Sequence, residues 1–183
     1  MELHGDRVRA LVESTGRPCT LHPFPAGEGS KNRECWARLT DELLATGMGR
    51  DGCVVALGGG VTGDLAGFVA ATYMRGIPVV QLPTSLVAMI DSAVGGKTGV
   101  DVPQGKNLVG AFHPPRVVLA DPELARTLPR EERAQGLAEA LKHGAIQDAE
   151  YLASLVDSRN ALLDGDPAVT AGAVLTSVQV KAR

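Results

Sequence analysis

Short apolar runs alternate with segments of helical spacing along most of the chain. Cys53–Leu57 is a continuous apolar run between turn residues, a pattern typical of a buried parallel strand. Ile77–Leu82 and Val117–Ala120 predict two further strands, and Cys19–Phe24 predicts one that Pro23 would confine to a sheet edge. Strands that alternate with helices indicate βαβ units, so we expect an α/β fold with a parallel sheet.

Helical spacing accounts for the segments between these runs. It predicts a short helix over Asp6–Ser14, a second from an N-cap at Ser30 to about Ala45, and a third that opens near Thr62–Asp64.

The pattern changes after Pro129, where helical spacing becomes dominant. A first helix would bury one apolar stripe, made of Ala134, Leu137, Ala138, Leu141 and Ala145. Tyr151–Val156 and Val169–Val180 predict two more helices. We therefore expect residues 1–129 to form an α/β domain and residues 130–183 to begin a helical one.

The charge balance and the distribution of apolar residues restrict the partners. A net charge of −3 leaves no basic footprint for nucleic acid. No apolar run reaches the roughly 18 residues that a membrane span needs, and the charged N-terminus is unlike a signal peptide. Cys19, Cys35 and Cys53 form no CxxC pair and are expected to be small buried or half-buried thiols. These features fit a cytoplasmic enzyme.

The chain carries 22 glycines beside one Trp, two Tyr and three Phe. Many lie in the middle of the chain, and Gly58–Gly63 matches G-x-G-x-x-G between the predicted strand and helix. Such a turn can bind a pyrophosphate through its N–H groups, although a tight turn without a ligand is the alternative. The next predicted strand ends without the acid of the common dehydrogenase pattern, while Asp64 lies in the turn itself.

A second group of polar residues follows the Ile77–Leu82 run. Gly95–Gly99 resembles the end of a P-loop, but Asp91 occupies the position that would need a glycine. Open α/β sheets bind ligands beyond the carboxyl ends of their strands, and lysines there suit phosphate or carboxylate groups. The candidates are Asp91, Lys97, Lys106 and Asn107; ordinary charged surface loops are the alternative.

Glu139 and Lys142 share one face of the predicted helix, where Glu139 borders the apolar stripe. Glu139 is either a metal ligand or half of an ion pair with Lys142. His143 lies four residues from Glu139, and spacing alone makes it only a weak candidate for a second ligand.

Two blocks of sequence resemble 3-dehydroquinate synthase: GGGVTGDLAGFVAATYMRGIPVVQLPTSLVAMIDSAVGGKTGVDVPQGKNLVGAFHPP and GLAEALKHGAIQD. The resemblance extends from about Pro25 to the last residue. It implies a Rossmann-like NAD-binding domain, incomplete at its N-terminus, followed by the first helices of an all-helical metal-binding domain. A divalent metal, usually zinc, would lie between them, and the enzyme would be a homodimer.

The same resemblance implies a function for individual residues. On the cofactor side it implicates Glu28, Lys31, Gly59, Gly60, Val61, Asp64, Thr84, Ser85, Lys106 and Thr127. Residues implied at the substrate and nicotinamide are Asp91, Lys97, Lys106, Asn107, Lys142 and Lys181, with Arg75 reaching the substrate phosphate from the neighbouring subunit. Glu139 would be the first metal ligand.

The implied reaction converts 3-deoxy-D-arabino-heptulosonate 7-phosphate into 3-dehydroquinate and phosphate in the shikimate pathway to aromatic amino acids. A transient oxidation by NAD acidifies a C–H bond, phosphate is eliminated, the hydride returns, and an aldol step closes the ring.

The family's metal site also needs two later histidines, the first in a G-H-x-x-G-H-like region that these 183 residues lack. We therefore expect the isolated chain to have little synthase activity and weak zinc affinity. A sister cyclase, such as 2-deoxy-scyllo-inosose synthase, and an inactive NAD-binding fragment are the alternatives.

Overall fold

The computed structural model describes residues 3–182, and its first part is built on a parallel sheet of three strands in the order β1-β2-β5. The strands are β1 (Val54–Gly58), β2 (Val79–Pro83) and β5 (Val117–Val118). The helices of this part are α1 (Gly5–Glu13), α2 (Arg33–Ala45) and α3 (Gly60–Thr72). Shorter helical segments are η1 (Glu28–Ser30), η2 (Tyr73–Arg75), η3 (Ala88–Ser92) and η4 (Pro122–Thr127). The α/β class expected from the sequence is confirmed.

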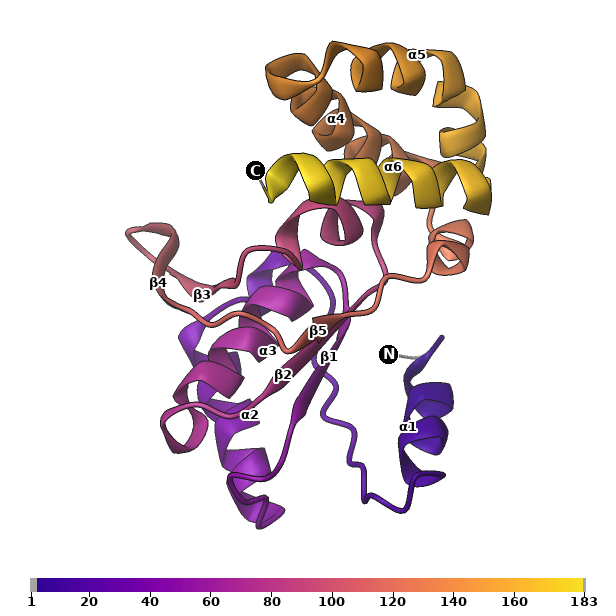
Figure 1. Cartoon of the computed structure of the whole chain (residues 1–183). Coiled ribbons are helices and arrows are strands. Elements are labelled where there is room, and N and C mark those ends of the chain that lie inside the picture. The colour runs from indigo at the N-terminus through magenta and orange to yellow at the C-terminus, as the bar shows by residue number, and fades with distance from the viewer. Residues whose placement is uncertain (1–2, 183) are drawn as a thin grey trace.

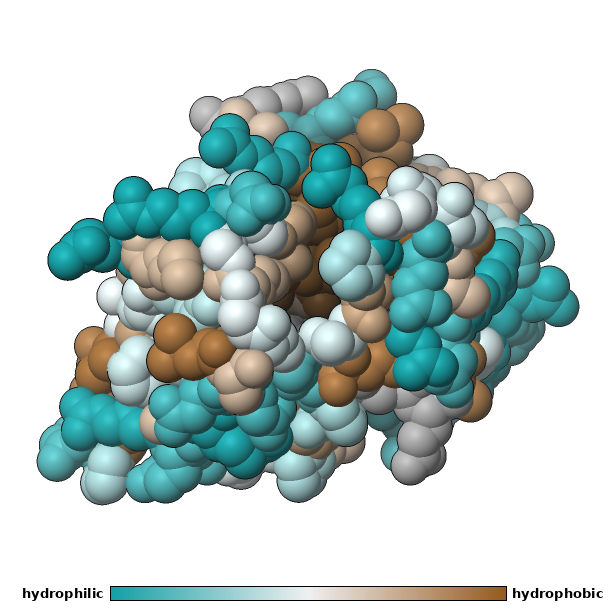
Figure 2. Space-filling view, turned by 90° about the horizontal axis from the view of Figure 1, so that it is seen from below, coloured by the Kyte–Doolittle hydropathy of each residue, from teal (hydrophilic) through white to brown (hydrophobic). Residues whose placement is uncertain are grey.

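One face of the sheet is covered and the other is partly exposed. Ala56, Val79 and Gln81 alternate along β1 and β2 and are buried on the side of α3, where the Gln81 side chain donates to the Gly63 carbonyl. Val55 and Val117 point the opposite way and are exposed. Figure 1 shows α1 across the strands from α2 and α3, and Figure 2 shows an apolar hollow in the face seen from below.

A β-hairpin occupies a segment for which the apolar pattern predicts no strand. β3 (Lys97–Val102) pairs antiparallel with β4 (Gly105–Phe112), and Gly99 lies opposite Gly110. A Cβ atom built on Gly110 would approach the Thr98 carbonyl oxygen to 2.1 Å, so this close pairing requires glycine. Because those glycines interrupt the alternation of apolar and polar residues, the sequence pattern conceals both strands.

Three long helices follow Pro129: α4 (Arg130–Gln147), α5 (Ala149–Asp164) and α6 (Pro167–Lys181). Helices α4 and α6 pack on η3, which lies between them and the sheet (Figure 1), and α5 packs on α4 and α6. Their common core joins Leu86, Met89 and Ile90 to Leu137, Tyr151, Leu155 and Leu162. The helical second part that the sequence predicts is confirmed.

The buried face of α4 differs from the predicted stripe. Ala134, Ala138 and Ala145 are exposed, and the inner face contains Gly136, Leu137, Ala140, His143 and Gly144. Glycines allow close approach here, since a Cβ on Gly136 would lie 2.4 Å from Leu86 Cγ. This rotation of the helix places His143 inside the protein.

Two other expectations at the N-terminal side are wrong. Cys19–Phe24 forms no strand in the described structure, because no neighbouring strand pairs with it. Asn32 rather than Ser30 caps α2: the Asn32 side chain accepts from the Cys35 N–H, and the Ser30 hydroxyl donates to the Pro25 carbonyl.

No helix within residues 3–182 combines the length and apolar character of a membrane-spanning segment.

Two glycine-to-alanine substitutions test the packing between η3 and α4. Gly136→Ala should lower the free energy of unfolding by about 1–3 kcal/mol, because the new methyl group overlaps the Leu86 side chain. The matched control is Gly172→Ala on the exposed side of α6, which has open space and should gain about 0.5–1 kcal/mol. Urea unfolding of both variants measures the difference, and equal stabilities would contradict the described packing.

Candidate functional site

The glycine turn lies where β1 passes into α3. The Thr84 N–H donates to the Gly58 carbonyl over 2.9 Å, which holds the end of β2 beside the turn. Cβ atoms built on Gly59 and Gly60 would lie 3.2 Å from Ser85 Oγ and 3.0 Å from Ser92 Oγ. No side chain among residues 3–182 caps this helix, so its first N–H groups and its dipole suit an anion such as a pyrophosphate.

Lys31 joins three distant segments of the chain beside this turn. Its ammonium donates to Asp64 Oδ2 over 2.5 Å and to Asn107 Oδ1 over 2.5 Å. The Lys31 side chain is only 5% exposed, so α3 and the hairpin are both tied to a buried charge. Each of these residues was predicted for the site, and the structure brings them together.

Burial raises the pKa of Asp64, while the hydrogen bond and charge of Lys31 lower it; Glu28 and Asp101 nearby raise it further. The pKa of Asp64 in the folded protein lies above its ordinary value. The folded protein therefore keeps the Asp64 proton at higher pH than the unfolded chain does, and this contribution to stability decreases as the pH rises through the folded pKa.

Asp64→Asn should remove that part of the pH dependence. The unfolding free energy of the variant, measured with urea over roughly pH 4–7, should decline less with rising pH than that of the wild type. Asp157→Asn, at an exposed position of α5, controls for the loss of one negative charge. Parallel pH curves for wild type and Asp64→Asn would contradict the proposed origin of the dependence.

Asp101 is a residue of this cluster that the sequence analysis missed. Its carboxylate accepts from the Asn107 N–H over 2.8 Å, and its own N–H donates to the Lys31 carbonyl over 2.8 Å. Asn107 has a positive φ of 58°, a conformation that the Asp101 contact helps to hold. The sequence carries no pattern that singles out Asp101, because the contact depends on the hairpin register.

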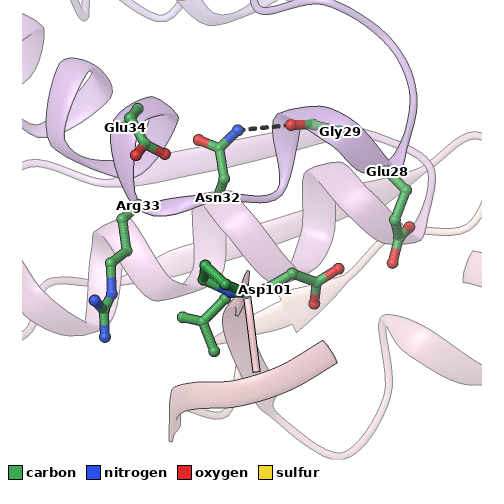
Figure 3. A pocket seen from close by; sticks show the side chains of 8 residues that line it. Glu28, Gly29, Asn32, Arg33, Glu34 and Asp101 are labelled. Atoms are coloured by element: carbon green, nitrogen blue, oxygen red, sulfur yellow. Dashed lines mark hydrogen bonds between the residues drawn. The ribbon is translucent and has the colours of Figure 1, made fainter. Parts of the chain in front are cut away.

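An open pocket of about 540 Å³ adjoins this cluster (Figure 3). Glu28 and Asp101 line it, with their carboxylates on the same side, and the Asn32 side chain donates to the Gly29 carbonyl. Lys106 pairs with Glu28 at 3.2 Å on the exposed rim.

A second cluster lies between η3 and α4. Asp91, Glu139 and His143 each offer one ligand atom, and these atoms all lie within 4.8 Å of one another. The His143 Nε2 atom is 3.5 Å from Glu139 Oε1 and 3.9 Å from Asp91 Oδ1. Glu139 thus lies where a divalent cation could be held.

Two lysines neutralise these carboxylates. Lys181, at the end of α6, donates to the backbone carbonyls of Asp91 over 2.5 Å and Val94 over 2.7 Å, and it contacts Asp91 Oδ1 at 2.9 Å. Lys142 forms an ion pair with Glu139 on α4, and this hydrogen bond raises the pKa of Lys142. The second cluster therefore contains four residues predicted from the sequence: Asp91, Glu139, Lys142 and Lys181.

Comparison with known proteins gives the same family as the sequence motifs. The family profile described as 3-dehydroquinate synthase N-terminal matches residues 21–135. This chain belongs to the 3-dehydroquinate synthase family.

Curated family members are similar along most of the chain. The 3-dehydroquinate synthase of Symbiobacterium thermophilum is 51% identical over 180 residues, which are 98% of this chain and 50% of that protein. The enzyme of Xanthomonas oryzae pv. oryzae (strain PXO99A) is 59% identical over 157 residues, 86% of this chain and 42% of its own length. The chain spans about half the length of the curated relatives it matches.

Solved structures of related cyclases have the same fold. ValA, a 2-epi-5-epi-valiolone synthase from Streptomyces hygroscopicus subsp. jinggangensis 5008 with NAD+ and Zn2+ bound, superposes with a TM-score of 0.92 at 33% identity, covering 98% of this chain and 51% of ValA. A 2-deoxy-scyllo-inosose synthase in complex with carbaglucose-6-phosphate, NAD+ and Co2+ gives 0.70 at 26% identity, covering 96% of this chain and 51% of that one.

Lys97, Arg75 and Thr127, which the resemblance to 3-dehydroquinate synthase also implicates, lie outside both clusters and away from the glycine turn. Lys97 is exposed at the start of β3, and its side chain makes no hydrogen bond to the described residues. Arg75 follows the C-terminal end of α3, and the glycine turn lies at the other end of that helix. Thr127 ends η4, where its hydroxyl donates to the Leu124 carbonyl.

Proposed function

We propose that this chain forms the cofactor-binding half of a 3-dehydroquinate synthase. The proposed reaction converts 3-deoxy-D-arabino-heptulosonate 7-phosphate into 3-dehydroquinate and phosphate, within the shikimate pathway in the cytoplasm. The observation that carries the proposal is the buried ammonium of Lys31, which joins Asp64 and Asn107 beside an uncapped glycine turn. The uncapped N–H groups at the start of α3 suit an anionic nucleotide, and Lys31 holds the hairpin beside them.

NAD is the proposed cofactor, and when bound it would accept a hydride from the substrate and return it. The N–H groups at Gly59, Gly60 and Val61 would bind its pyrophosphate at the start of α3. The other residues proposed to contact it lie around that turn, on nearby loops or, for Thr127, in η4: Glu28, Lys31, Asp64, Thr84, Ser85, Lys106 and Thr127.

The substrate would bind between the two clusters. A divalent metal, zinc by resemblance, would be held by Glu139 and would acidify a substrate hydroxyl. Asp91, Lys142 and Lys181 would orient the substrate from the second cluster, and Lys97, Lys106 and Asn107 from the hairpin. Lysines suit this role because the substrate carries a carboxylate and a phosphate.

A homodimer follows from the proposed role of Arg75. Because this arginine lies at the far end of α3 from the glycine turn, we propose that it acts on the partner's active site. We also propose that the two domains meet near residue 129, where η4 gives way to α4.

A hybrid protein tests the proposed activity. The C-terminal half of the Symbiobacterium thermophilum relative would follow Arg183, and phosphate release would be measured with NAD, Zn2+ and the heptulosonate substrate. We expect 3-dehydroquinate and phosphate in equal amounts. The similarity to ValA and to 2-deoxy-scyllo-inosose synthase favours a sister cyclase as the second candidate. Formation of 2-deoxy-scyllo-inosose from glucose 6-phosphate, without 3-dehydroquinate from the heptulosonate, would overturn the proposal.

A further inference from the structure

Ser92 occupies the last position of η3, beside the start of α3. Its Oγ atom has almost no exposed surface and no hydrogen-bond partner within the part of the chain that the structure describes. We propose that the Ser92 hydroxyl is a further cofactor-binding group, which donates a hydrogen bond to the pyrophosphate of the dinucleotide at the glycine turn. The inference rests on the proposed function, which places NAD at that turn and assigns it no residue of η3.

The glycine turn brings η3 and α3 close together. A Cβ atom built on Gly60 would lie 3.0 Å from Ser92 Oγ, closer than most contacts of a real Cβ atom, so a side chain at this position would crowd the hydroxyl. The first backbone bond of α3 runs from the Gly63 N–H to the Gly59 carbonyl over 3.0 Å, and the N–H groups before it have no partner within the helix. An anion bound by these N–H groups therefore lies beside the Ser92 hydroxyl.

The helical turn that carries Ser92 takes away the usual partner of its hydroxyl. Serine hydroxyls inside helices commonly donate to the carbonyl four residues back, which here belongs to Ala88. Because η3 is a π-helical turn, the Ala88 carbonyl accepts instead from the Ala93 N–H over 3.1 Å. Such turns are rare and are often found at functional sites, which agrees with a ligand-binding role for the side chain at its end.

Ser85 carries the other hydroxyl beside this turn. Its Oγ atom accepts from the Ala88 N–H over 3.3 Å, so this oxygen has a partner inside the protein. Ser92 makes no such bond within residues 3–182, and a buried hydroxyl without a partner is costly. A phosphoryl oxygen supplies the acceptor that the Ser92 proton lacks, and the negative charge of the phosphoryl group strengthens the bond.

A hydrogen bond from Ser92 would also connect the cofactor with the helical part of the protein. η3 packs against α4 and α6, and Lys181 of α6 donates to the carbonyls of Asp91 and Val94, which flank this serine in the sequence. A pyrophosphate held by both α3 and η3 would therefore restrain α6 relative to the sheet.

Calorimetric titration of the purified chain with NAD tests the role of Ser92. Ser92→Ala should weaken NAD binding at least roughly tenfold, because a hydrogen bond to a charged group is lost. Adenosine, which lacks the pyrophosphate, should bind the wild type and this variant equally. Ser154→Ala, at an exposed position of α5, is the matched control and should keep the wild-type affinity for NAD. Equal NAD affinity in wild type and Ser92→Ala would overturn the proposal, and so would an equal loss of affinity for adenosine.

Urea unfolding of the same variant separates a binding role from a structural one. Because Ser92 Oγ has no partner among the described residues, its removal should leave the urea midpoint unchanged or raise it. A lower midpoint together with weaker NAD binding would assign the hydroxyl to the fold and overturn the proposal.

A measurement on the wild type avoids dependence on any variant. Saturating NAD should slow hydrogen exchange of the η3 and α6 amides as well as those at the start of α3. Protection confined to α3 would overturn the role of Ser92 and leave the cofactor at the turn. A wild-type chain that does not bind NAD would reject the proposed cofactor role, and this inference with it.

Discussion

Replacing Lys31 with methionine should lower the free energy of unfolding by about 3–5 kcal/mol. The substitution keeps the aliphatic stem but leaves the half-buried Asp64 carboxylate without its partner and Asn107 Oδ1 without a donor. Breaking a buried pair by removing one member is costly because an uncompensated charge stays behind. Urea unfolding monitored by circular dichroism at neutral pH measures the change.

Lys106→Met is the matched control for this prediction. Lys106 pairs with Glu28, but its side chain is 70% exposed, so the loss should stay below about 1 kcal/mol. If the free energy of unfolding falls by the same small amount in both variants, the contacts of Lys31 with Asp64 and Asn107 do not hold the hairpin and α3 together.

Replacing Lys181 with methionine should have the second largest effect, about 2–4 kcal/mol. Its ammonium is bonded to two backbone carbonyls and lies beside the Asp91 carboxylate, and methionine replaces none of these contacts. Because Lys181 joins the end of α6 to η3 and to the residues just after it, the loss of stability should appear in these elements first. Hydrogen exchange of the α6 and η3 amides, together with urea unfolding, measures it.

Arg159→Met removes one positive charge from the exposed side of α5 and serves as the control. Protection in α6 that is unchanged in Lys181→Met would show that apolar packing alone holds this helix, contrary to the prediction.

The elements that were predictable from the sequence are those whose local pattern and tertiary role agree. The continuous apolar run at β1 and the helical spacing of α5 and α6 both reflect burial, so strand and helices were found, although Tyr151–Val156 covered only part of α5. The hairpin was missed because its glycine pair, Gly99 and Gly110, is dictated by close backbone contact and removes the alternation that marks a strand.

Some residues of the candidate site were likewise predictable from the sequence, and others were not. Motif residues such as Lys31, Asp64 and Asn107 were named from the sequence, and the structure brings them into contact. Asp101 was missed because its contact is fixed by the register of β3 against β4. His143 remained a weak candidate because the predicted stripe placed the wrong face of α4 inward, and only the packing of Gly136 against Leu86 corrects that face.

The bond between Lys181 and Asp91 also sets an order of events during synthesis. The two residues are 90 positions apart, so a large loop must close before the contact can form. The ribosome releases the sheet, the hairpin and the Lys31 cluster well before α6, and contacts of such sequence separation form slowly. The nascent chain is therefore expected to acquire its glycine turn early and the contact between Lys181 and Asp91 only when α6 docks.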